Sequence, residues 1–388
     1  MIAGHKLALV WILVSLQWTD RAVAVTPIAK PPWLHLAGHS LLDSDAGGVP
    51  LKPMPDLQAC VDRTVKRMGV TPNLRQHFSI FLANLSSQGG DIPYAQYNED
   101  KSMYGASIVK AAVLLSAHQL QQDLRQAVES AVNKSLSPSV SLKTAGVRLG
   151  IATDGNTLAQ MFTLGGGGNT DTHTDAKLEF SEAFKSDLTR MIRYSDNAKA
   201  SSVISRIGFN FIASVLWQRH LFDPAHGGGL WLGRAYGRDL EPWHRDPVNS
   251  LSHSANARAL GLLFVQLSRG ILISKGASES MLSYFANSSF HIKSIKAFED
   301  AGFQVNTDNH TDPAHRVTIY RKSGTMDGIS HDATLITRDA CLNTKCEQRI
   351  PLRYVAVVMT DHPKLAHQLG NTFLPLDQCV LDQTQKPL

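Results

Sequence analysis

Strand patterns at the two ends of the chain are separated by a long helical block, and this order constrains the fold more than any other feature. Strand patterns lie at residues 77–85, 94–97, 316–322, 333–337 and 352–359. Helical patterns fill most of the chain between these two groups. A sheet assembled from such distant segments has to pack against helices, so the sequence predicts an α+β fold.

The helical pattern that begins at Ile108 is apolar nearly all round as far as Leu124, which is typical of a helix buried on every side. We therefore expect this helix to run through the core. Further helical patterns cover residues 56–68, 180–194, 198–207, 209–217, 254–269 and 278–285, with a last helix around 365–381.

Composition excludes several classes of protein. The chain has 388 residues, of which 43% are hydrophobic and 18% charged, so it can bury the core of one large domain or two small ones. The formal charge of +5 is dispersed, with no run of five like charges. This argues against a nucleic-acid surface.

Residues 1–24 are typical of an export signal. His5 and Lys6 precede the apolar stretch 7–16, and Ala22-Val23-Ala24 supplies small residues for cleavage. The alternative is a buried N-terminal helix. Ten apolar residues are too few to span a membrane, so we expect a periplasmic or secreted protein without a membrane span in the mature chain. Residues 25–55 hold six of the 17 prolines and are expected to be a linker or tail.

Four cysteines, an even number, predict two disulfides in an exported protein. Cys341 and Cys346 suit a bridged hairpin loop, which leaves Cys60 and Cys379. Their spacing is not that of a zinc site, and the 16 histidines are expected to be surface or capping residues, so we predict no metal and no cofactor. The glycine runs at 165–168 and 227–229 lack the Lys-Ser/Thr of a phosphate loop and are expected to be flexible surface loops.

Three short motifs carry candidate chemistry. Ser107 lies three residues before Lys110 at the start of the buried helix, so the amine can reach the hydroxyl and act as its base. The sequence Ser195-Asp196-Asn197 follows a helical pattern, and Lys322-Ser323-Gly324-Thr325 follows a strand pattern. Alone, the second is typical of a helix cap and the third of a strand ending at a turn.

Together and in this order, the motifs resemble the S-x-x-K, S-D-N and K-T-G set of class A β-lactamases and penicillin-binding proteins. Tyr97-Asn98-Glu99 and His331-Asp332-Ala333 are similar to that family's flanking segments. The resemblance implies a catalytic domain at 56–388, with a five-stranded antiparallel sheet flanked by helices (56–106 and 290–388) and an inserted all-helical lobe (107–289). It also implies that the first and last helices lie side by side, and hence a Cys60–Cys379 bridge beside Cys341–Cys346.

The resemblance further implies a role for each residue of the motifs. Ser107 would be the acylated nucleophile, Lys110 its base, and Ser195 a relay of the proton to the leaving nitrogen. Asn197 would bind the acyl-amide side chain of the substrate. The substrate carboxylate would be bound by Lys322, Ser323 and Thr325, and the N–H groups of Ser107 and Thr325 would form an oxyanion hole.

One further residue decides what happens after acylation. Glu241, in the Glu-Pro pair at 241–242, is the candidate base for the deacylating water, and a solvated loop glutamate is the alternative. The segment 134–174 is longer than the resemblance predicts and is expected to be a lid or a disordered insertion.

We expect a monomeric β-lactamase that acts on small β-lactams. The alternatives are a D-Ala-D-Ala peptidase or transpeptidase acting on peptidoglycan stem peptides, and a penicillin-binding sensor that does not hydrolyse its ligand.

Overall fold

The fold was analysed in a computed structural model. It describes residues 30–32, 34, 50–86, 90–132, 143–147, 149, 151, 155–165, 177–237, 243–286, 293–306, 315–341 and 346–385. The expected export signal at residues 1–24 lies outside these ranges.

A seven-stranded sheet is the centre of the molecule, in the order β1-β3-β2-β14-β13-β12-β11. The five inner strands pair antiparallel, and the outermost pairs, β1 with β3 and β11 with β12, are parallel. The strand bounds are β1 Leu51–Pro53, β2 Phe78–Asn84, β3 Ile92–Tyr97, β11 Gln304–Val305, β12 Arg316–Met326, β13 Ile329–Cys341 and β14 Arg349–Thr360.

The α+β class is as predicted, but the expected strand count of five was wrong by two short edge strands. β1 lies within the range 25–55 that was expected to be a linker. Pro53 and its neighbours show no alternating pattern, and proline is tolerated in a sheet only at an edge, where its missing N–H breaks no ladder bond. Leu34, from the same range, is completely buried in the core.

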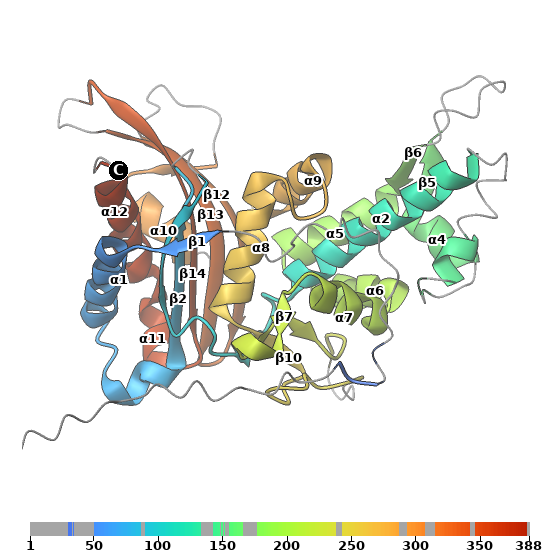
Figure 1. The fold of residues 1–388 in the computed structure, drawn as a ribbon, viewed down its shortest axis with the longest axis horizontal. Coiled ribbons are helices and arrows are strands. Elements are labelled where there is room, and N and C mark those ends of the chain that lie inside the picture. Colours follow the sequence, from blue (N-terminus) through green and yellow to red (C-terminus); the bar gives the residue numbers. More distant parts are fainter. Residues whose placement is uncertain are drawn as a thin grey trace, which may run out of the picture.

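Helices cover both faces of the sheet (Figure 1). One face packs against α1, α10, α11 and α12, and the other faces α8, α9 and the helical lobe beyond them. The helix bounds are α1 Pro55–Arg67, α2 Lys110–Val132, α4 Gly155–Met161, α5 Glu182–Arg193, α6 Asn197–Ile207, α7 Phe209–Gln218, α8 Ala257–Arg269, α9 Lys275–Phe285, α10 Lys293–Asp300, α11 Pro363–Gln368 and α12 Phe373–Thr384, with 3₁₀ turns η1 Pro72–His77, η3 Pro224–His226 and η5 Leu369–Thr372.

Helix α2 is the buried helix that the sequence predicts. Its first half, including Val113 and Leu120, is fully buried in the larger of the two hydrophobic clusters, between the sheet and the helical lobe. The smaller cluster lies between the sheet and α1, α10 and α12. Burying a helix on every side fixes its N-terminal turn against the sheet, and that turn carries Ser107.

Small strands complete the lobe. The first group, β4 Met103–Tyr104, β9 Trp231–Leu232 and β10 His253–Ala255, forms a three-stranded sheet. Two hairpins pair β5 Phe162–Gly165 with β6 Lys177–Phe180 and β7 Phe222–Asp223 with β8 Gly228–Gly229. Part of the 134–174 segment is therefore folded, because α4 and β5 lie in it and bury Met161 and Phe162.

The second glycine run does not form the expected flexible surface loop. Gly228 and Gly229 are buried in β8, and all three residues of the run have positive φ, from 71° to 134°. A Cβ at Gly227 would lie 2.2 Å from Asp100 O, and one at Gly229 would lie 2.4 Å from Leu221 O. These glycines permit close backbone approach rather than mobility.

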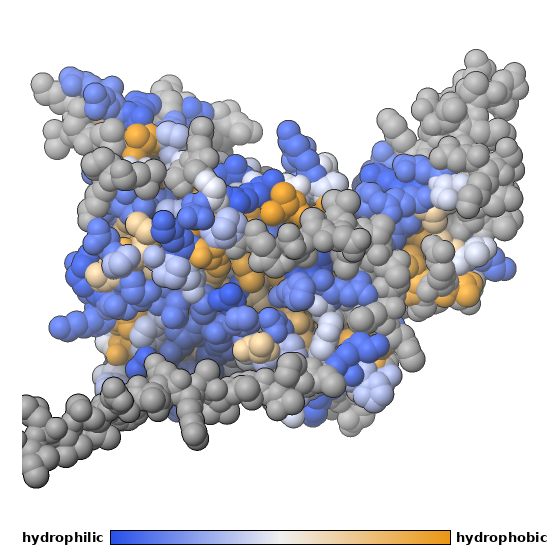
Figure 2. Space-filling model, viewed as in Figure 1, coloured by the Kyte–Doolittle hydropathy of each residue, from blue (hydrophilic) through white to orange (hydrophobic). Residues whose placement is uncertain are grey.

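The surface in Figure 2 is mostly hydrophilic over the described residues, with small separate apolar areas. Among the described residues the large apolar side chains that are exposed are Val147, Leu164, Tyr194, Ile271 and Met326. No single helix in the described ranges is long and apolar enough to cross a membrane, although α6 and α7, bent by 83° at their junction, pass that length and composition test as a pair.

Both predicted disulfides are confirmed. Helices α1 and α12 lie side by side on one face of the sheet (Figure 1), and Cys60 and Cys379 bridge them with a Cα–Cα distance of 5.7 Å. Cys341, at the end of β13, is bonded to Cys346.

Strand β12 meets the turn before α2 at a single glycine. A Cβ on Gly324 would lie 2.7 Å from Gly105 O and 2.8 Å from Ile108 N, closer than real Cβ contacts. Only glycine lets the Lys322–Thr325 strand lie against the turn that carries Ser107.

We expect Gly324→Ala to lower the free energy of unfolding by about 1–3 kcal/mol, the usual cost of overpacking a rigid backbone contact. Gly276→Ala is the matched control, because a Cβ there meets nothing within 4 Å. Urea unfolding of both variants measures the difference, and a Gly324→Ala variant as stable as the control would contradict the contact.

We expect the Cys60→Ser/Cys379→Ser double variant to lose more stability than Cys341→Ser/Cys346→Ser. The closed loops span 319 and 5 residues, and the loop-entropy model gives about 6 and about 2 kcal/mol. Urea unfolding midpoints show which double variant loses more stability. An equal loss, or a larger loss in Cys341→Ser/Cys346→Ser, would show that loop entropy does not determine the stability that each disulfide contributes.

Candidate active site

The candidate nucleophile lies in a tight turn between β4 and α2. Gly105 N donates to His253 O at 3.1 Å, which anchors the entry of the turn to β10, and Lys110 N donates to Ser107 O at 3.2 Å. Ala106 has φ of 44°, a left-handed conformation that a non-glycine residue adopts only at a cost. Ser107 is half-buried, and none of the described residues hydrogen-bonds its hydroxyl or its N–H. Both groups are therefore available to a substrate.

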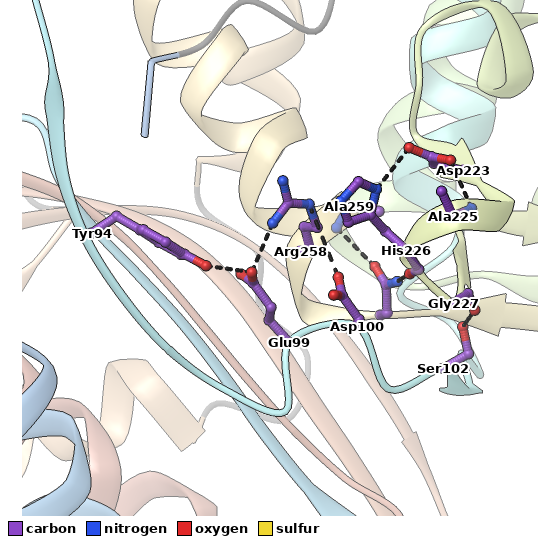
Figure 3. A network of polar contacts seen from close by, with 11 residues as sticks. Tyr94, Glu99, Asp100, Ser102, Asp223, Ala225, His226, Gly227, Arg258 and Ala259 are labelled. Atoms are coloured by element: carbon purple, nitrogen blue, oxygen red, sulfur yellow. Dashed lines mark hydrogen bonds and ion pairs between the residues drawn. The ribbon is translucent and has the colours of Figure 1, made fainter. Parts of the chain in front are cut away.

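A buried ionic network holds the segment that leads into this turn (Figure 3). Glu99 accepts a hydrogen bond from the Tyr94 hydroxyl of β3 and pairs with Arg258 of α8 at 2.8 Å. Arg258 also lies 4.0 Å from Asp100, and Ser102 donates to Gly227 O at 2.8 Å. The Tyr97–Glu99 segment, identified from the sequence, thus ties β3 to α8 just before the nucleophile.

Two lysine amines meet at one serine hydroxyl. Lys110 Nζ lies 3.3 Å from Ser195 Oγ, and Lys322 Nζ lies 3.1 Å from the same atom. Lys110 Nζ also donates to Ser195 O and Asn197 Oδ1, each at 2.6 Å. The structure therefore brings together residues from all three motifs. The expected hydrogen bond from Lys110 to Ser107 Oγ is not formed.

The pKa values of both amines are low because the lysines are buried. Burial lowers the pKa of Lys110 from 10.5 to about 7, and the negative charge of Asp196 opposes the shift. Burial, with the positive charges of Lys110 and Arg321, holds the pKa of Lys322 well below its usual value. Two ammonium groups 3.1 and 3.3 Å from one oxygen repel each other, so the pair favours loss of a proton.

The third motif lies within β12, which continues to Met326 instead of ending at Lys322 as the strand pattern predicted. Lys322 and Ser323 are buried and Thr325 is partly exposed. Lys322 Nζ donates to Ser323 O at 2.8 Å, so this amine is directed along the strand edge as well as toward Ser195. His331, opposite Gly324 on β13, donates from Nε2 to Tyr104 O at 2.9 Å. His331 is 1% exposed, so the expectation of surface histidines was wrong here.

Sequence reasoning missed two residues of the site, Tyr236 and His253. The Tyr236 ring lies 4.3 Å from Lys110 Nζ, and its hydroxyl donates to Ala106 O at 3.0 Å. The His253 ring contacts the rings of Tyr236 and Tyr104 in tilted pairs, with centroid distances of 4.8 and 5.8 Å. Neither residue belongs to a motif or a periodic pattern, because tertiary packing brings each of them to the site from a distant part of the sequence.

The candidate base Glu241 lies outside the described residues, together with the rest of 238–242. The chain leaves the described part of the structure at Gly237 and returns at Trp243, which stacks on Phe209 at 5.7 Å. Where the described ranges allow the test, no three His, Cys, Asp or Glu side chains are grouped so that they could hold a metal ion.

The arrangement suits nucleophilic acyl transfer. It combines an accessible serine hydroxyl, a buried amine with a pKa near neutrality, and a second hydroxyl held between two amines. This combination is the chemistry that the three motifs predict.

Comparisons with known proteins agree with the motifs. Residues 165–374, just over half of the chain, match the model described as the beta-lactamase enzyme family. No curated protein matches the sequence.

Among solved structures the chain is similar to PBP-A, at 14% identity and a TM-score of 0.48 over 86% of this chain and 98% of that one. It is also similar to a class A beta-lactamase from Mycobacterium abscessus (13%, TM-score 0.47, covering 85% and 100%) and to a beta-lactamase from Desulfarculus baarsii DSM 2075 (13%, TM-score 0.49, covering 86% and 100%). On the family match, together with the three motifs, the chain belongs to the beta-lactamase enzyme family.

Proposed function

We propose that this protein is an exported, monomeric serine hydrolase that opens β-lactam rings through an acyl-enzyme on Ser107. The observation that carries the proposal is the Ser195 hydroxyl, which lies within 3.3 Å of both lysine amines. The Ser107 hydroxyl, in turn, is hydrogen-bonded by none of the described residues. Export is proposed from residues 1–24 and is supported by the two disulfides.

In the acylation step, Ser107 Oγ forms a bond to the lactam carbonyl carbon and the ring C–N bond breaks. The neutral amine of Lys110 accepts the hydroxyl proton, which passes through Ser195 to the ring nitrogen. A serine oxygen has two lone pairs and one proton. Neutral Lys110 has two N–H groups, enough for Ser195 O and Asn197 Oδ1, and one lone pair for the Ser107 proton. Lys322 still donates to Ser195 Oγ, and the O–H of Ser195 is proposed to point toward the leaving nitrogen.

Charge that develops on the carbonyl oxygen needs N–H donors. Ser107 N has no partner within the described part of the chain, and it is one proposed donor. The second is Thr325 N. The carbonyl of Ser323 accepts from the Lys322 side chain, which indicates that it points away from β13, and ladder alternation predicts the same direction for Thr325.

Binding of the substrate uses the remaining groups. The amide of Asn197 accepts from Lys110 through Oδ1, so its NH₂ is left to donate to the acyl side chain of the substrate. The hydroxyls of Ser323 and Thr325, with the charge of Lys322, are proposed to hold the substrate carboxylate.

Deacylation separates a hydrolase from a protein that is only acylated. We propose that Glu241 removes a proton from water, which attacks the ester and returns Ser107 to its hydroxyl form. This step is proposed from the Glu-Pro pair in the sequence alone. The catalytic domain is proposed to span 56–388, with the sheet-bearing parts and the helical lobe divided near 107 and 289.

Intact-mass spectrometry after mixing with benzylpenicillin tests the function. We expect an adduct of one whole penicillin that appears and then decays while the antibiotic is consumed. Ser107→Ala should show no adduct, because the substitution removes the hydroxyl that attacks the lactam carbonyl. An adduct that persists would reject hydrolysis in favour of the peptidase or sensor alternatives, and an adduct on Ser107→Ala would reject the nucleophile.

Glu241→Ala should acylate at the normal rate and then stall, with turnover of a chromogenic cephalosporin reduced by about a hundredfold or more. Asp239→Ala is the matched control, two residues away in the sequence, and should turn over normally. If Asp239→Ala stalls while Glu241→Ala does not, the water-activating carboxylate is Asp239.

A further inference from the structure

The ring of Tyr236 covers one side of the Lys110 amine, at a position the three motifs do not account for. The ring centroid is 4.3 Å from Nζ, within the range of a cation–π contact. The other partners of Nζ are Ser195 O, Ser195 Oγ and Asn197 Oδ1. Within the described ranges, no carboxylate contacts this amine.

The Tyr236 hydroxyl acts on a different group. It donates to Ala106 O at 3.0 Å, and burial raises the pKa of the phenol above its usual value, so the hydroxyl stays protonated. Ala106 O belongs to the same peptide group as Ser107 N–H. Because a trans peptide is planar, its C=O and N–H point in opposite directions, and holding one aims the other.

We propose that Tyr236 is a positioning residue with two separable effects: its ring face stabilises the charged form of Lys110, and its hydroxyl aims the Ser107 N–H at the oxyanion. The second effect rests on the proposed acyl transfer at Ser107, whereas the first concerns Lys110 in the resting protein. Tyr236 lies five residues before Glu241 in the sequence.

The loop holds Tyr236 firmly enough for this purpose. Ser201 Oγ of α6 accepts from Tyr236 N at 2.9 Å and donates to Tyr236 O at 2.7 Å. The His253 ring contacts the Tyr236 ring with a centroid distance of 4.8 Å, and its Nε2 donates to Arg234 O at 2.9 Å. These contacts fix both the backbone and the plane of the ring.

The hydroxyl contact also opposes strain. Ala106 adopts φ of 44° immediately before the nucleophile, and a peptide in this region persists only where its surroundings hold it. The hydrogen bond from Tyr236 is one such restraint, on the carbonyl that follows the strained angle.

Other charges face Lys110 and have to stay constant in a test. They are Lys322 on β12, Asp196 in the turn before α6, and His253 on β10. Burial lowers the pKa of His253 to about 4, so His253 is neutral where Lys110 titrates. Asp196 is bound to Arg190 at 2.8 Å and remains ionised.

Substitution of Tyr236 separates the two effects. Tyr236→Leu keeps an apolar side chain over Lys110 but removes the aromatic ring. The ammonium form of Lys110 then loses an attraction, so the midpoint of the Lys110 titration should fall by about 0.5 to 1.5 pH units. Tyr236→Phe keeps the ring and should leave the midpoint in place. The Phe variant loses the hydrogen bond to Ala106 O, so its limiting acylation rate should fall about tenfold, less than removal of an oxyanion donor costs.

NMR titration of ¹³Cε-labelled lysine measures the midpoint without any substrate, with the Lys110 signal assigned from Lys110→Arg. Tyr284→Leu is the matched control, a buried ring of α9 beside His118, and should leave the midpoint unchanged. Tyr236→Met replaces the Leu variant if the latter does not fold. The acylation rate is measured with benzylpenicillin at a pH where it has levelled off.

A midpoint in Tyr236→Leu equal to that of the wild type would overturn the role of the ring. A Phe variant that acylates at the wild-type limiting rate would overturn the role of the hydroxyl. If the wild-type protein forms no adduct on Ser107, the proposed function and the hydroxyl effect both fall, while the titration still decides the ring effect.

Discussion

The sharing of one serine hydroxyl by two buried lysines is the interaction on which the site depends. Lys110 comes from the core helix, Lys322 from the sheet, and Ser195 from the turn between α5 and α6. Burial makes a charge on Lys110 costly, and the negative charge of Asp196 opposes only part of this effect. The pKa of Lys110 therefore falls to about 7, which is what a base working at neutral pH requires.

Backbone strain places the reacting groups. Ala106, immediately before Ser107, has φ of 44°. Ser195, the first residue of the second motif, has φ of 55°. The contacts around them are specific: Gly324 lets β12 lie against the Ser107 turn, and Tyr236 holds the Ala106 carbonyl. Strain of this kind persists because α2 is packed on every side and cannot relax.

The sequence predicted the α+β class, all five inner strands, both disulfides and the meeting of Lys110, Ser195, Asn197 and Lys322. The class and the strands follow from apolar period. The Cys60–Cys379 bridge and the meeting of the motif residues were implied by the family resemblance that the three motifs carry. The edge strands were missed because three residues with a proline carry no period, and Gly227–Gly229 were misassigned because close backbone approach leaves no local mark. Tyr236 and His253 were missed because their roles arise from ring contacts between β4, β10 and the loop after β9, which are distant in the sequence.

The pH dependence of Ser107 acylation tests the central claim, that burial of Lys110 beside Ser195 and Lys322 makes its amine a neutral base near pH 7. The second-order rate of adduct formation with benzylpenicillin is measured from pH 5 to 10. Below its pKa the Lys110 amine carries a proton and cannot accept another, so the rate should rise with pH and level off with a midpoint near 7. A rate that is independent of pH, or that rises only above about pH 9 as for an ordinary lysine, would contradict the account.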